Sequence, residues 1–208
     1  MKWSDWVLSI MDELSILQNL YHKVDILGFS TGCNIALYVS QFKWNCKINN
    51  IIMTAPNFLP NKGDIIFKNS FKINFIAYIF TFIYPVCHRP YESRLNKCNK
   101  KKNNNRNNIF FEKNFPSYSA IEMWKFQDIL PKTFYGNQII MIKANNDKMV
   151  GDVKEQKLLI EKNLNLDIEL LNIPSRENSN LKVGHNIFNS HDIIISDCFN
   201  MIKNYIIN

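Results

Sequence analysis

A serine flanked by two glycines carries the clearest chemical signal in the sequence. Residues 28–32 read Gly-Phe-Ser-Thr-Gly, and they lie between apolar stretches at 24–27 and 34–39. The first stretch predicts a short buried strand and the second a packed helix. A serine at the turn from a strand into a helix is held in a strained backbone conformation and can act as a nucleophile. Without that context the pattern is an ordinary glycine turn, so the flanking elements favour the nucleophile.

The residues around Ser30 have distinct expected roles. We expect Gly28 and Gly32 to be required, because a Cβ at either position would collide with the neighbouring strand or helix. Phe29 completes the turn on the strand side. Thr31 would open the helix, where backbone N–H groups lack intrahelical acceptors and can stabilise a developing oxyanion. The Thr31 N–H is therefore an expected oxyanion donor.

A serine nucleophile needs a general base, and the base needs a carboxylate to orient it. Asp147 directly follows a predicted strand at 138–144, and His185 follows another predicted strand at 167–173. Because functional side chains of parallel sheets gather at the carboxyl ends of the strands, both would project beside Ser30. The chain order Ser, Asp, His thus supplies a complete candidate triad.

Other residues compete for these roles less well. Asp128 and Asp152 are acids that do not directly follow a strand, and Cys33 is better explained as a buried thiol than as a second nucleophile. Asp147 as a plain turn residue and His185 as a surface-loop residue are the alternatives to the triad. The remaining histidines precede the first strand, lie in a long insertion or adjoin the last helix: His22, His88 and His191.

Predicted strands and helices alternate along the sequence on either side of these residues. Strands are predicted at 24–27, 48–54, 138–144 and 167–173, and helices at 6–20, at about 153–163 and at about 190–206. The expected apolar face of the first helix comprises Trp6, Ile10, Leu14, Leu17 and Leu20. The expected buried residues of the last helix are Ile194, Ile195, Cys198, Met201, Ile202 and Tyr205. Strands that alternate with helices predict an α/β fold with a parallel sheet.

A long insertion separates the second and third predicted strands. It spans about 57–137 and is too long for a loop, so we expect a cap within a single domain at 1–208. Its aromatic and apolar stretch at 73–84 is expected to form a helix over the mouth of the site. That stretch suits either an acyl-chain substrate or simple packing of the cap.

Composition excludes several classes of protein. The 208 residues are 46% hydrophobic, which is a globular composition, and the net charge is +7. The basic cluster at 97–106 lacks aromatic residues for base stacking, so we expect a solvated loop and no nucleic-acid partner. Codon bias toward Lys, Asn and Ile explains the positive charge without any anionic ligand.

The cysteines and the amino terminus indicate the cellular compartment of the protein. The five cysteines form no Cys-x-x-Cys pair and are expected to be reduced. Residues 1–13 lack the apolar stretch of a signal peptide, which predicts a cytoplasmic protein. The longest apolar run, 73–86, contains Asn74 and Pro85 and is too short to span a bilayer. At most it touches a membrane surface.

Together these motifs resemble the α/β-hydrolase family of serine hydrolases, and more closely its capped carboxylesterase and monoacylglycerol-lipase-like members. Residues 28–32 resemble the family's nucleophile elbow, 144–150 its acid turn and 183–187 its histidine loop. The resemblance implies hydrolysis of a small ester or acyl substrate by Ser30, His185 and Asp147, without a metal or an organic cofactor.

One departure from the family pattern changes the expectation for activity. The family has an oxyanion loop with a His-Gly pair upstream of the elbow, whereas this chain has no such pair and only 29 residues before Ser30. The resemblance implies the C-terminal half of the family's sheet, with an apolar edge at 24–27. We expect the activity of this chain alone to be weak or absent, and a separately encoded N-terminal half could pair with it. The alternatives are an inactive remnant and a membrane-surface or partner-binding protein that uses residues 73–84.

Overall fold

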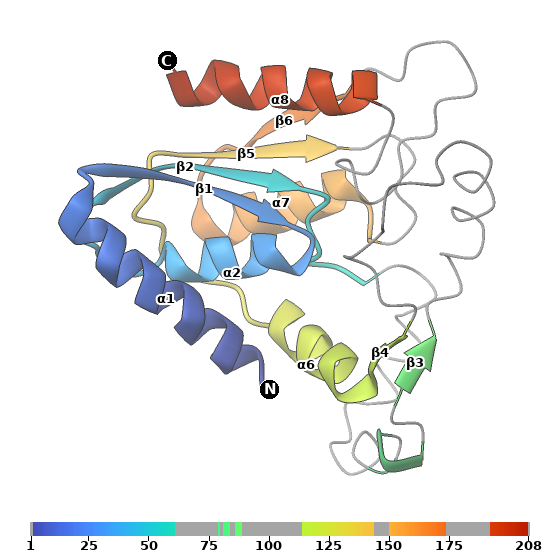
Figure 1. Ribbon diagram of the computed structural model, residues 1–208. Coiled ribbons are helices and arrows are strands. Elements are labelled where there is room, and N and C mark those ends of the chain that lie inside the picture. The colour runs from blue at the N-terminus through green and yellow to red at the C-terminus, as the bar shows by residue number, and fades with distance from the viewer. Residues whose placement is uncertain are drawn as a thin grey trace.

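A parallel sheet forms the centre of the molecule (Figure 1). The computed structural model describes residues 2–60, 79, 81–83, 86–88, 114–143, 150–173 and 192–207. Its four parallel strands lie in the order β1-β2-β5-β6. Their bounds are Lys23–Phe29 for β1, Lys47–Thr54 for β2, Gln138–Lys143 for β5 and Glu169–Asn172 for β6. The predicted parallel α/β architecture is confirmed.

Helices cover both faces of this sheet (Figure 1). One face packs against α2 (Thr31–Val39) and α7 (Val153–Leu164), and the other packs against α8 (Asp192–Ile207). Alternate residues of the central strands supply the two faces, as the strand period of two requires. Ile51 and Met53 of β2 face α2, whereas Ile52 faces α8.

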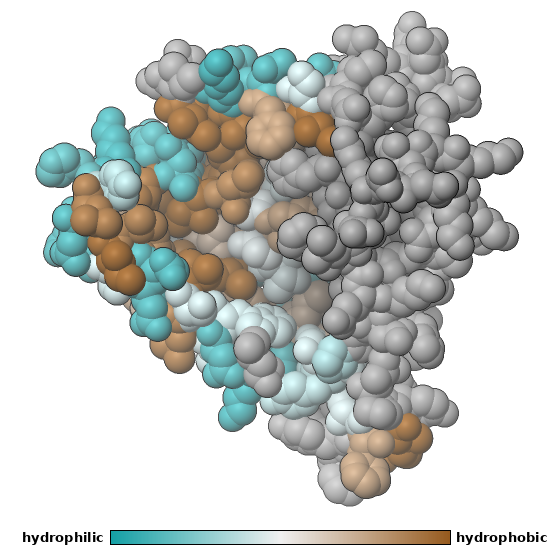
Figure 2. Space-filling view, in the orientation of Figure 1, coloured by the Kyte–Doolittle hydropathy of each residue, from teal (hydrophilic) through white to brown (hydrophobic). Residues whose placement is uncertain are grey.

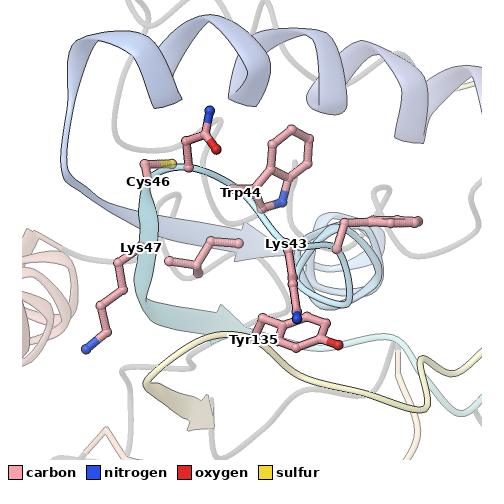
Figure 3. Close-up of a pocket in the computed structure, with 8 residues that line it drawn as sticks. Lys43, Trp44, Cys46, Lys47 and Tyr135 are labelled. Atoms are coloured by element: carbon pink, nitrogen blue, oxygen red, sulfur yellow. The ribbon is translucent and has the colours of Figure 1, made fainter.

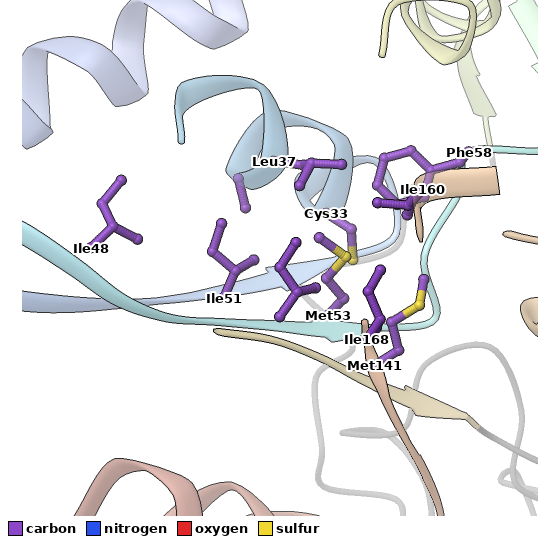
Figure 4. Close-up of a cluster of buried hydrophobic side chains, with 11 residues drawn as sticks. Cys33, Leu37, Ile48, Ile51, Met53, Phe58, Met141, Ile160 and Ile168 are labelled. Carbon is purple, nitrogen blue, oxygen red and sulfur yellow. The ribbon is translucent and has the colours of Figure 1, made fainter. Parts of the chain in front are cut away.

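The larger core lies on the α2 and α7 face (Figure 4). Leu37 of α2 and Ile160 of α7 are completely buried against the strands. Burying side chains of this size contributes about 1.5–3 kcal/mol each. The last helix is anchored on the other face by Cys198 and Ile202, with Met201 and Tyr205 packed beside them. The side chain of Ile194 lies outside the described residues, and Ile195 is half-buried.

The first helix, α1 (Trp3–Leu20), is longer than predicted and presents a different face. Val7 and Leu14 are buried, whereas Ile10 and Leu20 are 37% and 67% exposed. The predicted face was therefore wrong at these two positions. A contact distant in sequence sets the rotation of α1 about its own axis, because Trp3 stacks on Phe126 with ring centroids 5.1 Å apart.

The segment between β2 and β5 contains elements that the sequence did not predict. Strands β3 (Val86–His88) and β4 (Asn114–Pro116) form an antiparallel pair, and α6 (Ser117–Gln127) follows directly. Helix α6 packs against α1 and α2. Of the helix predicted at 73–84, residues 79 and 81–83 are helical and the others lie outside the described residues. No described helix is long and apolar enough to cross a membrane.

Strand β1 is an edge of the sheet within the described part of the chain. Helix α1 covers Val24 and Ile26 on one face. Leu27 points to the α8 face, beside Ile52 of β2, and is 49% exposed. Figure 2 shows an apolar surface in this region, between β1 and α8. The sequence predicted such an apolar edge at 24–27.

Candidate active site

Ser30 stands at the junction of β1 and α2 with a strained backbone. Its dihedral angles are φ 53° and ψ −123°, and it occupies the N-cap position of α2. A non-glycine residue in this region costs of order 1–3 kcal/mol and persists only where surrounding contacts hold it. Its side chain does not cap the helix. A strained serine thus joins a strand to a helix, and we call the turn formed by residues 28–33 the elbow.

Thr54, the last residue of β2, holds this turn in place. The Ser30 backbone N–H donates to the Thr54 carbonyl oxygen at 3.0 Å, and the Thr54 hydroxyl donates to the Gly28 carbonyl oxygen at 3.0 Å. Thr54 is fully buried, so no water competes for these bonds. A third bond at 3.0 Å runs from the Cys33 N–H to the Ser30 carbonyl oxygen. Sequence reasoning missed Thr54, whose only signal is its place at the end of the neighbouring strand.

The two glycines of the elbow differ in what they permit. A Cβ on Gly28 would lie 2.8 Å from the Cys33 Cα, so the strand and helix approach too closely for any side chain. A Cβ on Gly32 would meet no heavy atom within 4 Å in the described part of the chain. The collision predicted at Gly32 was therefore wrong. Gly32 lies in the first turn of α2.

Thr31 is the first residue of α2, as expected. The first four N–H groups of a helix have no acceptor within it, so the Thr31 N–H belongs to a set of donors directed out of the helix end. The hydroxyl of Thr31 accepts a hydrogen bond from the Asn57 Nδ2 at 3.3 Å. Phe29, the last residue of β1, pairs with Thr54.

Cys33 belongs to the core. Its side chain is completely buried, and its Sγ donates to the Thr54 carbonyl oxygen at 3.4 Å. Desolvation by burial raises the pKa of this thiol far above its ordinary value. A nucleophilic thiolate is thereby disfavoured, and the interpretation of Cys33 as a buried residue is confirmed.

A second set of contacts ties the loop after β2 to the start of α7. The backbone N–H groups of Phe58 and Leu59 point to the Gln156 Oε1, at 2.6 and 3.4 Å. Gln156 is completely buried and its Nε2 donates to the Gly151 carbonyl oxygen. The Gly151 N–H donates to the Leu59 carbonyl oxygen at 3.0 Å. These bonds fix the start of α7 against the loop after β2.

Asp147 and His185 lie outside the described residues. The strands next to them are described, and their register is informative: Phe29 pairs with Thr54, and Thr54 with Ile142. The carboxyl ends of β1, β2 and β5 therefore share one edge of the sheet.

The rival acids occupy helix ends. Asp152 caps α7 by accepting from the Lys154 and Glu155 N–H groups at 2.8 and 3.2 Å. Asp128 ends α6 as its C-cap residue. A capping role of this kind is sufficient to explain Asp152.

Other features of the described chain do not belong to this edge. A hollow of about 330 Å³ involves Lys43, Trp44 and Tyr135, with the Lys43 Nζ 5.2 Å from the centre of the Tyr135 ring (Figure 3). Lys47 also lines it and begins β2, so the hollow lies at the opposite end of the strands from Ser30. Among the described residues, no three His, Cys, Asp or Glu side chains are grouped to hold a metal ion.

Solved structures show that the chain has the α/β-hydrolase fold. Monoacylglycerol lipase from Paleococcus ferrophilus matches with a TM-score of 0.63 and 11% identity, over 99% of this chain and 75% of the lipase. A soluble variant of monoglyceride lipase from Saccharomyces cerevisiae, in complex with a substrate analog, matches with a TM-score of 0.63 and 14% identity, over 98% and 67%. An α/β hydrolase from Penicillium sp. sh18, GrgF, gives 0.59 and 11%, over 99% and 71%. No protein-family model and no curated protein matches the sequence.

Proposed function

We propose that this chain carries the catalytic elbow of a serine hydrolase that cleaves carboxylic esters. The observation that carries the proposal is the backbone of Ser30, with φ 53° at the junction of a parallel strand and a helix. The α/β-hydrolase fold supports it, and two of the similar structures are lipases of monoacylglycerols. A lipid or other acyl ester is accordingly the substrate class that we propose.

In the proposed reaction, Ser30 Oγ attacks the ester carbonyl carbon while His185 takes the hydroxyl proton. Asp147 holds the imidazole and stabilises the imidazolium that forms. The Thr31 N–H faces the negative oxygen of the tetrahedral intermediate. His185 then gives the proton to the leaving alkoxide oxygen, the ester C–O bond breaks, and the alcohol departs while the acyl group stays on Ser30. Water, deprotonated by His185, attacks this acyl group. His185 returns the proton to Ser30 Oγ as the carboxylic acid leaves. No metal or organic cofactor has a role in these steps.

A fluorophosphonate probe tests the nucleophile directly. We expect the probe to modify Ser30, because its phosphorus reacts with an activated serine oxygen and releases fluoride. Peptide mass spectrometry should place the label on Ser30, and Ser30→Ala should abolish it. Labelling that persists unchanged in Ser30→Ala would refute the assignment. Cys33→Ala is the matched control, since we expect it to leave the site of labelling unchanged.

A second candidate is an incomplete hydrolase that needs a further polypeptide. The edge position of β1 and the 49% exposure of Leu27 favour it. The partner would be a separately encoded N-terminal segment that pairs with β1 and supplies the second oxyanion donor. Loss of one such donor typically costs about 10²–10³ in turnover. Co-expression with a strand-rich upstream segment should then raise ester hydrolysis together with the yield of soluble protein, whereas full activity of the purified chain alone would exclude this candidate.

A further inference from the structure

Three polar side chains from separate parts of the fold form a continuous hydrogen-bonded chain that ends at the elbow. The Gln127 Nε2 donates to the Asn57 Oδ1 at 2.7 Å, and the Asn57 Nδ2 donates to the Thr31 hydroxyl oxygen at 3.3 Å. Gln127 is the last residue of α6, Asn57 lies in the loop after β2, and Thr31 opens α2. The chain of bonds therefore connects α6 to the residue that follows Ser30.

Burial makes these contacts specific. Gln127 is 4% exposed and Asn57 is 6% exposed, so water cannot readily replace either partner. Within the described part of the chain the Gln127 Oε1 has no hydrogen-bond partner, which leaves the bond to Asn57 as the one that compensates burial of this amide. Asn57 accepts through its Oδ1 and donates through its Nδ2, so loss of the bond to Gln127 would leave the bond to Thr31 less well oriented.

The chain of bonds complements the contacts made by Thr54. Thr54 holds Ser30 and Gly28 from the side of β2. Asn57 holds the next residue, Thr31, from the side of α6. The loop that carries Asn57 is turned by Ala55, whose φ is 49°, and it is fixed beyond Asn57 by the Gln156 bond to Phe58. A rigid loop thus presents the Asn57 amide to the elbow.

We propose that Asn57 and Gln127 are positioning residues, which hold Thr31 so that its backbone N–H is aligned with the carbonyl oxygen of an ester that reacts at Ser30. The inference rests on the proposed function for its catalytic consequence, but its structural claim concerns the order of the elbow itself. It also makes α6 part of the control of Ser30 reactivity, because a displacement of α6 would be passed through Gln127 and Asn57 to Thr31.

Hydrogen exchange tests the structural claim whether or not the protein is active. The Ser30 and Cys33 N–H groups are both bonded within the elbow and report its opening. Asn57→Ala should raise their exchange rates about tenfold, because it removes a buried hydrogen bond at each end of Asn57. Asn50→Ala is the matched control: Asn50 is also a buried asparagine, and its Nδ2 donates to the Tyr205 carbonyl oxygen. Equal effects of both variants on the elbow amides would overturn the proposal.

Thr31 probes the same contact from the other end without placing a change in the core. Thr31→Val removes the hydroxyl that accepts from Asn57, whereas Thr31→Ser retains it. We expect faster exchange at Ser30 and Cys33 in Thr31→Val and rates restored toward wild type in Thr31→Ser. This pair also decides the question if Asn57→Ala does not fold. Exchange rates in Thr31→Val equal to those in Thr31→Ser would overturn the proposal.

Covalent labelling tests the catalytic consequence. Asn57→Ala, Gln127→Leu and Thr31→Val should lower the rate constant for fluorophosphonate labelling of Ser30 by about 10–100-fold, because small misplacement of a catalytic donor costs rate of this order. For a short soluble ester, the loss should fall on kcat with KM little changed. Absence of labelling in the wild type would refute the proposed function while exchange still decides the structural claim. Normal labelling of all three variants would overturn the positioning role.

Discussion

The carbonyl oxygen of Thr54 accepts the backbone N–H of Ser30 at 3.0 Å, across the ladder between β2 and β1. Because Ser30 has a positive φ, its conformation depends on partners of this kind rather than on its own preference. Thr54, the last residue of β2, therefore fixes Ser30, which directly follows the neighbouring strand β1.

Thr54→Val should destabilise the elbow with almost no change in side-chain volume. The substitution leaves the Gly28 carbonyl oxygen without its 3.0 Å bond to the Thr54 hydroxyl. We expect the free energy of unfolding to fall by about 1–3 kcal/mol, as measured by urea denaturation, because the acceptor stays buried. Thr54→Ser keeps the hydroxyl, so its free energy of unfolding should fall by less. A loss in Thr54→Ser that equals the loss in Thr54→Val would show that packing, not the hydrogen bond, is responsible.

The two elbow glycines should respond in opposite ways to alanine. Gly28→Ala places a Cβ 2.8 Å from the Cys33 Cα, and backbone must shift to admit it. We expect a loss of about 1–3 kcal/mol in the free energy of unfolding.

Gly32→Ala is the internal control for this comparison. It adds a methyl group where no described atom lies within 4 Å, and it should stabilise α2 by about 0.5–1 kcal/mol. Thermal unfolding of both variants distinguishes the two effects. Equal destabilisation would contradict the geometry of the elbow.

Ser30 should carry backbone strain that glycine relieves. At φ 53° and ψ −123°, glycine has no Cβ to oppose the conformation, whereas alanine retains the strain. Ser30→Gly should therefore be more stable than Ser30→Ala by about 1–3 kcal/mol in urea denaturation. Both variants lack the hydroxyl, so loss of its contacts cancels in the comparison. Equal stabilities would show that the turn is unstrained.

The proposed triad should lose activity as a unit. Members of a triad are strongly non-additive, so Ser30→Ala/His185→Ala should hydrolyse a short ester no more slowly than Ser30→Ala alone. The same holds for Ser30→Ala/Asp147→Ala. Initial rates with p-nitrophenyl acetate provide the measurement. Losses that multiply would show that His185 or Asp147 acts independently of Ser30.

Leu27 should promote association through the β1 edge. An exposed apolar side chain on an edge strand favours pairing with another chain. Leu27→Glu should lower concentration-dependent association in sedimentation equilibrium and leave the fold intact.

Leu8 of α1 supplies the control for Leu27. It is 56% exposed, against 49% for Leu27, so Leu8→Glu removes a similar apolar surface from a helix instead of an edge strand. We expect Leu8→Glu to leave association unchanged. An equal decrease in both variants would indicate general surface hydrophobicity rather than the edge.

Local patterns were sufficient to predict the central architecture. The apolar runs at 48–54 and 138–144 match β2 and β5 closely, because strands buried on both faces are continuous apolar segments. The expectation of a glycine before Ser30 has a similar basis, because the strand and the helix meet too closely at Gly28 for any side chain.

Contacts between distant segments decided what the sequence could not. The rotation of α1 depends on Phe126, which stacks on Trp3, and the elbow depends on Thr54, Asn57 and Gln127. Periodicity describes a helix face only to within the width of its apolar stripe, so packing partners choose among adjacent rotations. A polar residue at a strand end or in a loop carries no local signal of its partner. The sequence by itself therefore determined the four strands of the parallel sheet and the position of Ser30 between β1 and α2, because local apolar runs specify them. The tertiary structure decided the elements between β2 and β5, and it decided which buried donors and acceptors hold that serine in place.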